Sequence, residues 1–475
     1  MLHLGAMVQC SYWCSKARSS LLLAVALLLA PACATTAQSI ETSPPPAPKP
    51  NYILPAAEIV VFDAALHAFD RAFLNDTGAF SVTPASIRRN LRAKWVVDDD
   101  LYEINQVGHP YQGSMYHGFA RSAGLNYWAS SAYTFAGSLL WEIAGETSTP
   151  SFNDQIASGI AGSFLGEALF RTANLLIDKA DNKPGFGRML LVLFVSPPTA
   201  ANRALFGDRF DRVMPTRDPM YDARIQAGAS RDETMLDLSL DYGLPGTPTY
   251  TYRRPFDNFN VHAILSSKSI LESFMTRGLL AGQDYARGMA IRGVWGLYGS
   301  YDYLSPELFR VSTTALSVGT SLQSWLSEHV ALQGAALGGI GYAAAQTLSD
   351  AAVRSPNGPT YGVSERAYHY GVAPQGMISA RLVAADRVSL DLSAREYYVS
   401  NIGGLDGNGR DTITRADVSI GLRFYKRNAI TVRYLLTQRD WEGAADVPSR
   451  LRRTSLGLFY TLLGPQHFGA VDWRR

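Results

Sequence analysis

The residues of this chain that could do acid–base chemistry gather between positions 105 and 171. Glu142 and Glu146 are four positions apart, so a helix would place both carboxylates on one face. Carboxylates at this spacing repel each other unless a cation, a shared proton or a hydrogen-bond donor lies between them. Histidine and carboxylates suit acid–base work on an ester or a phosphoryl group. The candidate catalytic residues are His109, Glu142, Glu146, Asp154 and Glu167.

The same segment has a structural interpretation, in which its polar residues join helices to each other or to another part of the fold. Glu167 and Arg171 are four positions apart and could form an ion pair. Ser151 and Asp154 have the spacing of a capping box at a helix start. A third use is the binding of a ligand or a lipid, for which the candidates are Asn105, Tyr111, Trp141, Asn153 and Arg171.

Motifs of several enzyme classes are missing from the sequence. It has no phosphate-binding glycine loop, no nucleophile elbow and no His-Glu-x-x-His zinc helix. His117 follows His109, but seven intervening residues are not a typical metal-ligand spacing. We therefore expect no metal site and no cofactor.

Four short motifs follow one another in the polar segment. They are Asn-x-x-x-His-Pro-Tyr-x-Gly at 105–113, Ser-Leu-Leu-Trp-Glu at 138–142 with Gly-Glu at 145–146, Pro-Ser-x-Asn-Asp at 150–154, and Gly-Glu-x-x-x-Arg at 166–171. In this order they resemble the bacterial family catalogued as domain of unknown function 3943. The resemblance covers about residues 100–180. It implies no reaction, because the activity of that family is not established.

Composition limits the classes of partner. The 475 residues include 43 Lys and Arg against 41 Asp and Glu, a net charge of +2, which predicts no nucleic-acid partner. All three cysteines, Cys10, Cys14 and Cys33, lie near the N-terminus. The rest of the chain therefore has no disulfide and no thiolate nucleophile.

The N-terminus is typical of an exported protein. Lys16 and Arg18 precede the short apolar run 21–30, and small residues follow, so residues 1–37 are predicted to be a signal peptide. Lipidation of Cys33 is an alternative processing route, although Pro31 departs from the usual lipobox. Residues 38–51 form a Pro-rich linker.

Residues 52–215 are predicted to be a mainly helical domain. Apolar residues at helical spacing indicate helices over 56–74, 116–143 and 152–177, and a further apolar run covers 189–195. In the third helix Gly159, Gly162 and Gly166 fall close to one face, which allows another backbone to approach closely. No segment after the signal peptide has the length and apolarity of a transmembrane helix, so a membrane span must be a β-barrel.

From residue 216 to 463 the pattern predicts an antiparallel transmembrane β-barrel. Apolar and polar residues alternate strictly in 236–242 and 388–393. Long connections at 349–365, 401–411 and 441–451 alternate with tight turns at 385–387 and 426–428. This alternation of long outer loops and short periplasmic turns is typical of bacterial outer-membrane barrels.

The predicted barrel has about ten strands, and twelve are an alternative. The strands are placed at 234–243, 257–267, 285–303, 307–325, 328–346, 366–384, 388–400, 412–425, 429–440 and 452–463. The connection 268–284 is predicted to contain a helix, and residues 464–475 to form a periplasmic tail. The helical domain could plug the lumen, cap the barrel from the periplasm, or lie against the membrane.

Three functions agree with these patterns. The first is a structural or partner-binding outer-membrane protein, the second an outer-membrane enzyme acting on lipid or envelope substrates, and the third a narrow channel or transporter. The expected partners are outer-membrane lipids and, during biogenesis, the barrel-assembly machinery. The sequence does not indicate an oligomeric state.

Overall fold

The computed structural model describes residues 49–73, 78–98, 100–180, 182–207, 220–247, 250–347, 368–401, 403–404, 410–442 and 450–464. The predicted signal peptide, Cys33, most of the linker at 38–51 and the tail after Gly464 lie outside the described residues.

The first part of the chain is the helical domain, residues 53–206. Its elements are α2 (Ile53–Phe73), α3 (Pro84–Asn90), the π-helical turn η1 (Ile104–Gly108), α4 (His109–Ser122), α5 (Tyr127–Ala144), α6 (Phe152–Ile156), the π-helical turn η2 (Ala157–Ala161), α7 (Gly162–Asp178), α8 (Phe186–Val195) and α9 (Pro197–Phe206). No helix in the described part of the chain is long and apolar enough to cross a membrane.

Local signals in the sequence explain where these helices begin and end. The hydroxyl of Ser151 accepts a hydrogen bond from the backbone N–H of Asp154 and starts α6, as the capping-box spacing predicted. The single helix predicted over 116–143 is wrong, because the chain forms two helices there. Gly124 between them has a φ of 92°, and Asn126 caps the second helix.

The second part of the chain is a closed antiparallel barrel, as the sequence pattern predicted, and it has the twelve strands that were the alternative to about ten. The strands are β1 (Tyr221–Ser230), β2 (Thr234–Tyr242), β3 (Phe259–Ser266), β4 (Ser273–Arg287), β5 (Ile291–Leu304), β6 (Phe309–Trp325), β7 (Val330–Thr347), β8 (Tyr368–Ala384), β9 (Val388–Val399), β11 (Arg410–Tyr425), β12 (Asn428–Glu442) and β13 (Arg450–Leu463). The pairing of β1 with β13 closes the barrel, and the short β10 (Gly403–Gly404) pairs with β8.

The predicted ten-strand arrangement differs from this barrel at two strands. β1 was not predicted, and the helix predicted within 268–284 is wrong because β4 occupies that segment. A bulge between Leu279 and Ala281 interrupts the register of β4 with β5. At the bulge two apolar residues, Leu279 and Leu280, follow each other directly. They interrupt the alternation of apolar and polar residues that identifies a strand.

The two faces of the barrel wall differ in chemistry. Charged side chains such as Arg433, Asp237 and Arg381 face the lumen, where they line a common cavity. Outward-facing positions away from the helices are apolar and exposed, as at Trp295, Leu316, Ile420, Val432 and Leu458. A closed barrel with an apolar exterior is the architecture of an outer-membrane protein.

The two ends of the barrel also differ. Tight turns of two to four residues, 288–290, 326–329, 385–387 and 426–427, join strands at one end, which we call the tight-turn end. Two long connections, 348–367 and 400–409, leave from the opposite end, the long-loop end, which also carries the short turns 231–233 and 305–308. The long connection between β2 and β3, 243–258, is an exception at the tight-turn end. In outer-membrane barrels short turns lie in the periplasm.

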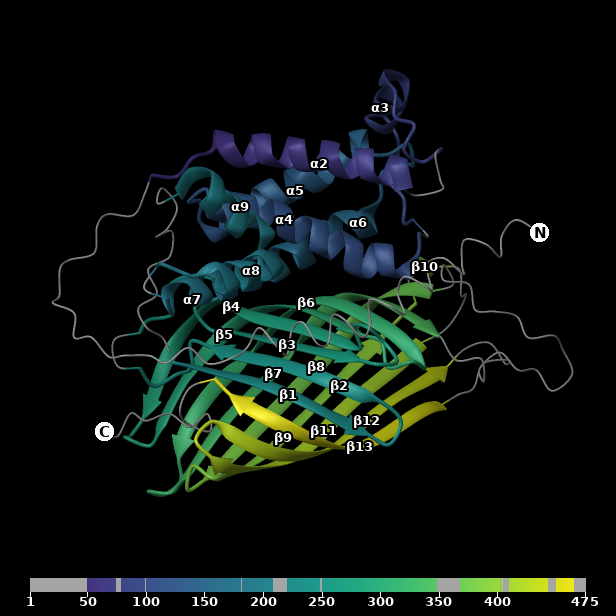
Figure 1. Cartoon of the computed structure of the whole chain (residues 1–475). Helices are drawn as coiled ribbons and strands as arrows, with labels where there is room; N and C mark the ends of the chain where they lie inside the picture. The colour runs from purple at the N-terminus through teal and green to yellow at the C-terminus, as the bar shows by residue number, and fades with distance from the viewer. Residues whose placement is uncertain are drawn as a thin grey trace, which may run out of the picture.

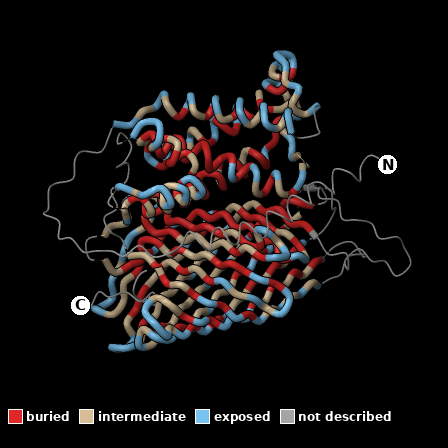
Figure 2. Tube along the Cα trace, in the orientation of Figure 1, coloured by how far each residue is buried: buried red, intermediate tan, exposed pale blue. Residues whose placement is uncertain are grey.

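The helical domain packs against the outside of the barrel, as Figure 1 shows. Helix α7 contacts β3, β4 and β5, and the buried stretch of wall beneath the helices is visible in Figure 2. The contacts begin at Tyr221, the first residue of β1 at the tight-turn end, and extend to Tyr368, the first residue of β8 at the long-loop end. The helical domain therefore covers one flank from rim to rim, and its described helices do not form the lumenal plug considered from sequence.

Candidate functional site

The helices that carry the polar motifs pack closely together at glycine positions. A Cβ on Gly162 would lie 2.6 Å from Cα of Gly113, and a Cβ on Gly166 would lie 2.7 Å from Cβ of His117. The prediction that small residues allow close backbone approach is confirmed, since α7 and α4 meet at these positions. This contact fixes His109 at the start of α4 against η2 and α6.

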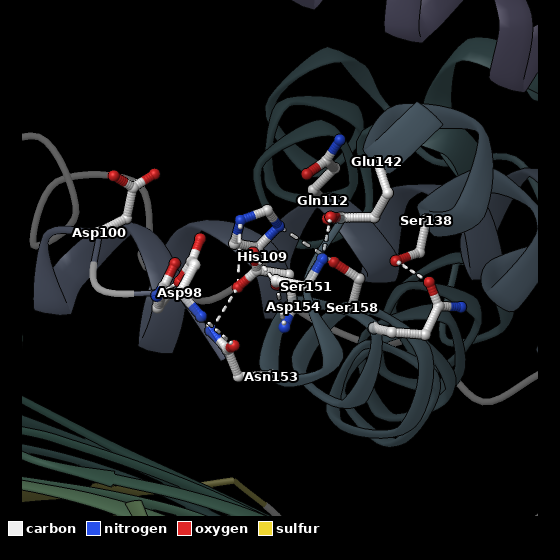
Figure 3. A network of polar contacts seen from close by, with 12 residues as sticks. Asp98, Asp100, His109, Gln112, Ser138, Glu142, Ser151, Asn153, Asp154 and Ser158 are labelled. Carbon is white, nitrogen blue, oxygen red and sulfur yellow. Dashed lines mark hydrogen bonds and ion pairs between the residues drawn. The ribbon is translucent and has the colours of Figure 1, made fainter. Parts of the chain in front are cut away.

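His109 lies between a serine and an aspartate (Figure 3). Its Nδ1 is 3.2 Å from the hydroxyl of Ser158, and its Nε2 is 3.6 Å from Oδ1 of Asp154. All three side chains are buried, and a π-helical turn adjoins His109 at η1 and contains Ser158 at η2. Interruptions of this kind are frequent at functional sites.

Glu142 lies next to this group. Its Oε2 accepts a hydrogen bond of 2.8 Å from the backbone N–H of Ser151, while the buried Oε1 has no hydrogen-bond partner among the described residues. Burial, followed by the nearby charges of Asp154 and Glu146, raises the pKa of Glu142 to about 9. Burial also raises the pKa of Asp154 well above its ordinary value. Glu142 therefore favours the neutral, proton-donating form near pH 7.

Glu146 is less enclosed than Glu142. It lies just after the end of α5 and is half-buried. Burial raises its pKa to about 7, and the nearby His109 opposes the rise. The side chain of Asn90 donates to the backbone carbonyls of both glutamates, which fixes the end of α5.

Two asparagines connect this group to the barrel. The amide of Asn153 donates to Asp98 at 2.9 Å, to Asp154 at 3.0 Å and to the hydroxyl of Tyr370 at 3.0 Å. The amide of Asn105 donates to Asp98 at 2.6 Å and to the hydroxyl of Tyr368 at 2.8 Å. Both tyrosines belong to β8 and face outward, so the polar group spans the boundary between the helical domain and the barrel wall. We call His109, Glu142, Ser151, Asn153, Asp154 and Ser158, with Asp98 and Asn105, the first cluster.

Other residues of α4 and α7 form a second cluster. Its centre is the carboxylate of Glu167. Arg121 and Arg171 hold its carboxylate at 2.6 and 2.8 Å, and Nε2 of His117 lies 3.1 Å away. Burial raises the pKa of Glu167, but the two guanidinium groups and His117 outweigh it and hold the pKa well below its usual range. Glu167 is therefore ionised and fully paired.

The second cluster also reaches the barrel. Arg171 donates to Oδ1 of Asp257 at 3.1 Å and to the carbonyl of Pro255 at 2.6 Å, both in the connection between β2 and β3. The Glu167–Arg171 ion pair that the spacing suggested forms, and it belongs to a chain of charges that ends on the barrel.

The structure thus divides the residues predicted from the sequence. It brings together His109, Glu142, Asp154, Asn105 and Asn153 in the first cluster, with Glu146 at its edge. It places Glu167 and Arg171 in the second cluster. Tyr111 is 46% exposed, and Trp141 is buried against Gly145.

Sequence reasoning missed several partners of the first cluster. Ser158, Asp98, Tyr368 and Tyr370 were not singled out, and the two tyrosines lie more than 200 residues away along the chain. Ser158 follows Asp154 at one helical turn, which was the only available signal. Among the described residues no three His, Cys, Asp or Glu side chains are placed to hold a metal ion.

Comparisons with solved structures return outer-membrane barrels. The "KdgM porin" is 6% identical and covers 51% of this chain and 98% of its own, with a TM-score of 0.24. A "NanC porin" is 9% identical, covers 51% and 99%, and has a TM-score of 0.28. The "outer membrane channel DcaP of Acinetobacter baumannii" is 8% identical, covers 53% and 99%, and has a TM-score of 0.22.

No curated protein matches the chain in sequence. A family model does match, and it covers the helices and clusters just described. Residues 94–198 match the model of the family described as "Domain of unknown function (DUF3943)", so the resemblance expected from the sequence motifs is confirmed for this segment.

Proposed function

We propose that this protein is an outer-membrane scaffold, in which a non-conducting barrel holds the helical domain on its flank. The observation that carries the proposal is the docking contact made by the first cluster, in which Asn105 and Asn153 donate to Tyr368 and Tyr370 of β8. The motif residues are thus used to position the domain on the wall.

Glycines in the barrel wall support a permanent attachment of the helical domain. Gly278 of β4 and Gly299 of β5 are register partners and face outward. A Cβ on Gly299 would lie 2.4 Å from the ring of Phe164 on α7. A Cβ on Gly278 would lie 2.3 Å from the ring of Phe256 in the barrel's β2–β3 connection, and Phe256 in turn stacks on Tyr127 of α5. The wall therefore has two recesses that the aromatic rings fill.

The lumen supports the non-conducting part of the proposal. Arg381 of β8 bonds Asp222 of β1 across the lumen and Asp391 of β9 beside it. Arg433 of β12 bonds Asp237 of β2. A cavity of about 190 Å³ lies beside these crossing ion pairs. Small barrels are usually filled by side chains, whereas barrels of about 16–18 strands leave an aqueous channel.

A second candidate function is hydrolysis of an ester, because Ser158, His109 and Asp154 have the order of a nucleophile, a base and an orienting acid. In such a site His109 would take the proton of the Ser158 hydroxyl as that oxygen attacks a carbonyl carbon. Two features oppose this use. Ser158 is 1% exposed, and the raised pKa of Asp154 favours its neutral form.

One experiment separates the two candidates. Full-length protein and its Ser158→Ala variant are incubated in vesicles of envelope lipids, and the lipids are analysed by mass spectrometry. The scaffold predicts identical lipid profiles for both proteins. A lipid product that the native protein forms and the folded variant does not form would reject the scaffold and establish the hydrolase.

A further inference from the structure

Helix α2 has its polar and apolar faces reversed relative to a helix in water. Its exposed positions are apolar except for Arg71, and they include Ile53, Val60, Val61 and Phe73 at 82%, 55%, 68% and 70% exposure. The surface helices of proteins in water expose their charged residues instead.

Two of the three acidic groups of α2, Glu58 and Asp63, contact other helices of the domain. Asp63 is buried and receives a hydrogen bond from the hydroxyl of Tyr116, and Glu58 receives one of 3.5 Å from Asn202 of α9. Burying carboxyl groups while exposing valine and phenylalanine is unfavourable in water. It is favourable where the solvent is hydrocarbon.

Two more helices repeat the pattern. On α8 the exposed residues Phe186, Leu190, Leu193 and Phe194 fall on one helical face. On α5 the exposed large side chains are Trp128, Phe135, Leu139 and Leu140. The apolar exterior of the helical domain therefore involves several of its helices and greatly exceeds the scattered apolar residues of an ordinary surface.

The position of the helical domain on the barrel indicates which environment surrounds its apolar exterior. The helices cover the outward face of the wall from Tyr221 at one rim to Tyr368 at the other. Beside them the uncovered wall is the apolar band of the barrel, with Trp295 and Leu297 on β5 and Leu316 and Val318 on β6. A domain that contacts a transmembrane wall near both of its rims lies at the depth of the lipids that surround that wall.

We propose that the helical domain lies within the outer-membrane hydrocarbon layer beside the barrel, and that the outward faces of α2, α5 and α8 contact lipid acyl chains. The proposal needs the barrel to span the membrane, but it does not depend on the scaffold function. The apolar faces and the barrel's own band then form one continuous surface in contact with lipid.

Site-directed spin labelling tests the proposal. Single cysteines replace Val61 on α2 or Phe194 on α8 in the full chain, with Cys10, Cys14 and Cys33 changed to serine. The labelled proteins are reconstituted in phosphatidylcholine vesicles. Collision rates of each label are measured with oxygen, which concentrates in hydrocarbon, and with a water-soluble nickel chelate. The controls are labels at Ile420, exposed on the apolar wall of β11, and at Glu328, exposed in a tight turn.

Labels at Val61 and Phe194 are expected to collide with oxygen several-fold more often than with the nickel chelate, as at Ile420. Nickel accessibility equal to that at Glu328 would place these faces in water and overturn the proposal. Low accessibility to both reagents would also overturn it, because protein would then cover the faces. The dependence of that protection on protein dilution would show whether the cover is a second copy of this chain.

Discussion

The side-chain amide of Asn153 on α6 donates a hydrogen bond of 3.0 Å to the hydroxyl of Tyr370 on β8. The two residues are 217 positions apart and belong to different domains. The same hydroxyl accepts from Asn105 at 3.3 Å and from Gln106 at 3.1 Å. One phenol oxygen of the barrel thus joins α6 to the π-helical turn η1.

Tyr370→Phe is expected to loosen the helical domain while leaving the barrel intact. Removal of the hydroxyl deprives buried amide groups of an acceptor, which costs about 1–3 kcal/mol. The measurement is the urea midpoint of the helical circular-dichroism signal in detergent micelles. Tyr434→Phe, on the exposed face of β12, is the control and should leave the midpoint unchanged. An equal shift in both variants would mean that the interdomain bond contributes nothing specific.

Gly299→Val should separate the helical domain from the wall. The new side chain would enter the space of the Phe164 ring, and overpacking of this kind costs about 1–3 kcal/mol. Limited proteolysis of α7 in micelles reports the separation, and heat modifiability reports the barrel. Gly338→Val on β7 is the matched control, because nothing lies within 4 Å of a Cβ at that glycine. Resistance to protease in the Gly299 variant would contradict the docking contact.

The stability of the helical domain should depend on pH through Glu142. Its pKa is raised from 4.5 to about 9. The unfolded chain releases this proton near pH 4.5 and the folded chain retains it, so the stabilisation is full below that pH and is lost as the pH rises through about 9.

Glu142→Gln cannot ionise and should remove this dependence. Relative to the native protein, the variant should gain about 4 kcal/mol between about pH 5 and pH 8, because three pH units contribute about 1.4 kcal/mol each. Urea midpoints of the helical signal at both pH values measure the gain. Glu328→Gln, in an exposed turn, is the control. A constant difference between variant and native protein would show that Glu142 ionises in the folded state as it does in water.

Glu167→Gln should destabilise the domain more than any other single change in the two clusters. It leaves Arg121 and Arg171 buried without their shared carboxylate, and breaking a buried pair in this way costs about 3–5 kcal/mol. The loss should appear as a lower urea midpoint at every pH at which the protein folds. A variant as stable as the native protein would mean that Asp257 alone compensates the charge of Arg171.

Elements with a regular local pattern could be predicted from the sequence, whereas features that depend on long-range contacts could not. The alternation in β9 and β11 survives because one face of each meets the lumen and the other is apolar and exposed. β4 was missed because the helical domain covers much of its outer face and a bulge shifts its register. The proximity of Glu142 and Asp154 could not be predicted from helix spacing, because the two residues lie on different helices. Ser151, in the link between α5 and α6, hydrogen-bonds to both of them and brings them together.

The last prediction concerns the ion pairs that cross the barrel lumen. The Arg381–Asp222 and Arg433–Asp237 pairs cross it between strands that are not neighbours. Planar-bilayer recordings of the native protein should therefore show no steady conductance, and the channel function would be rejected. Arg381→Ala with Arg433→Ala removes both crossing cations and enlarges the cavity, so this variant should show small, frequent current steps. Gln375 to Ala is the control, because Gln375 faces the lumen without carrying a charge. A native protein that conducts as well as the double variant would mean that the ion pairs do not close the lumen.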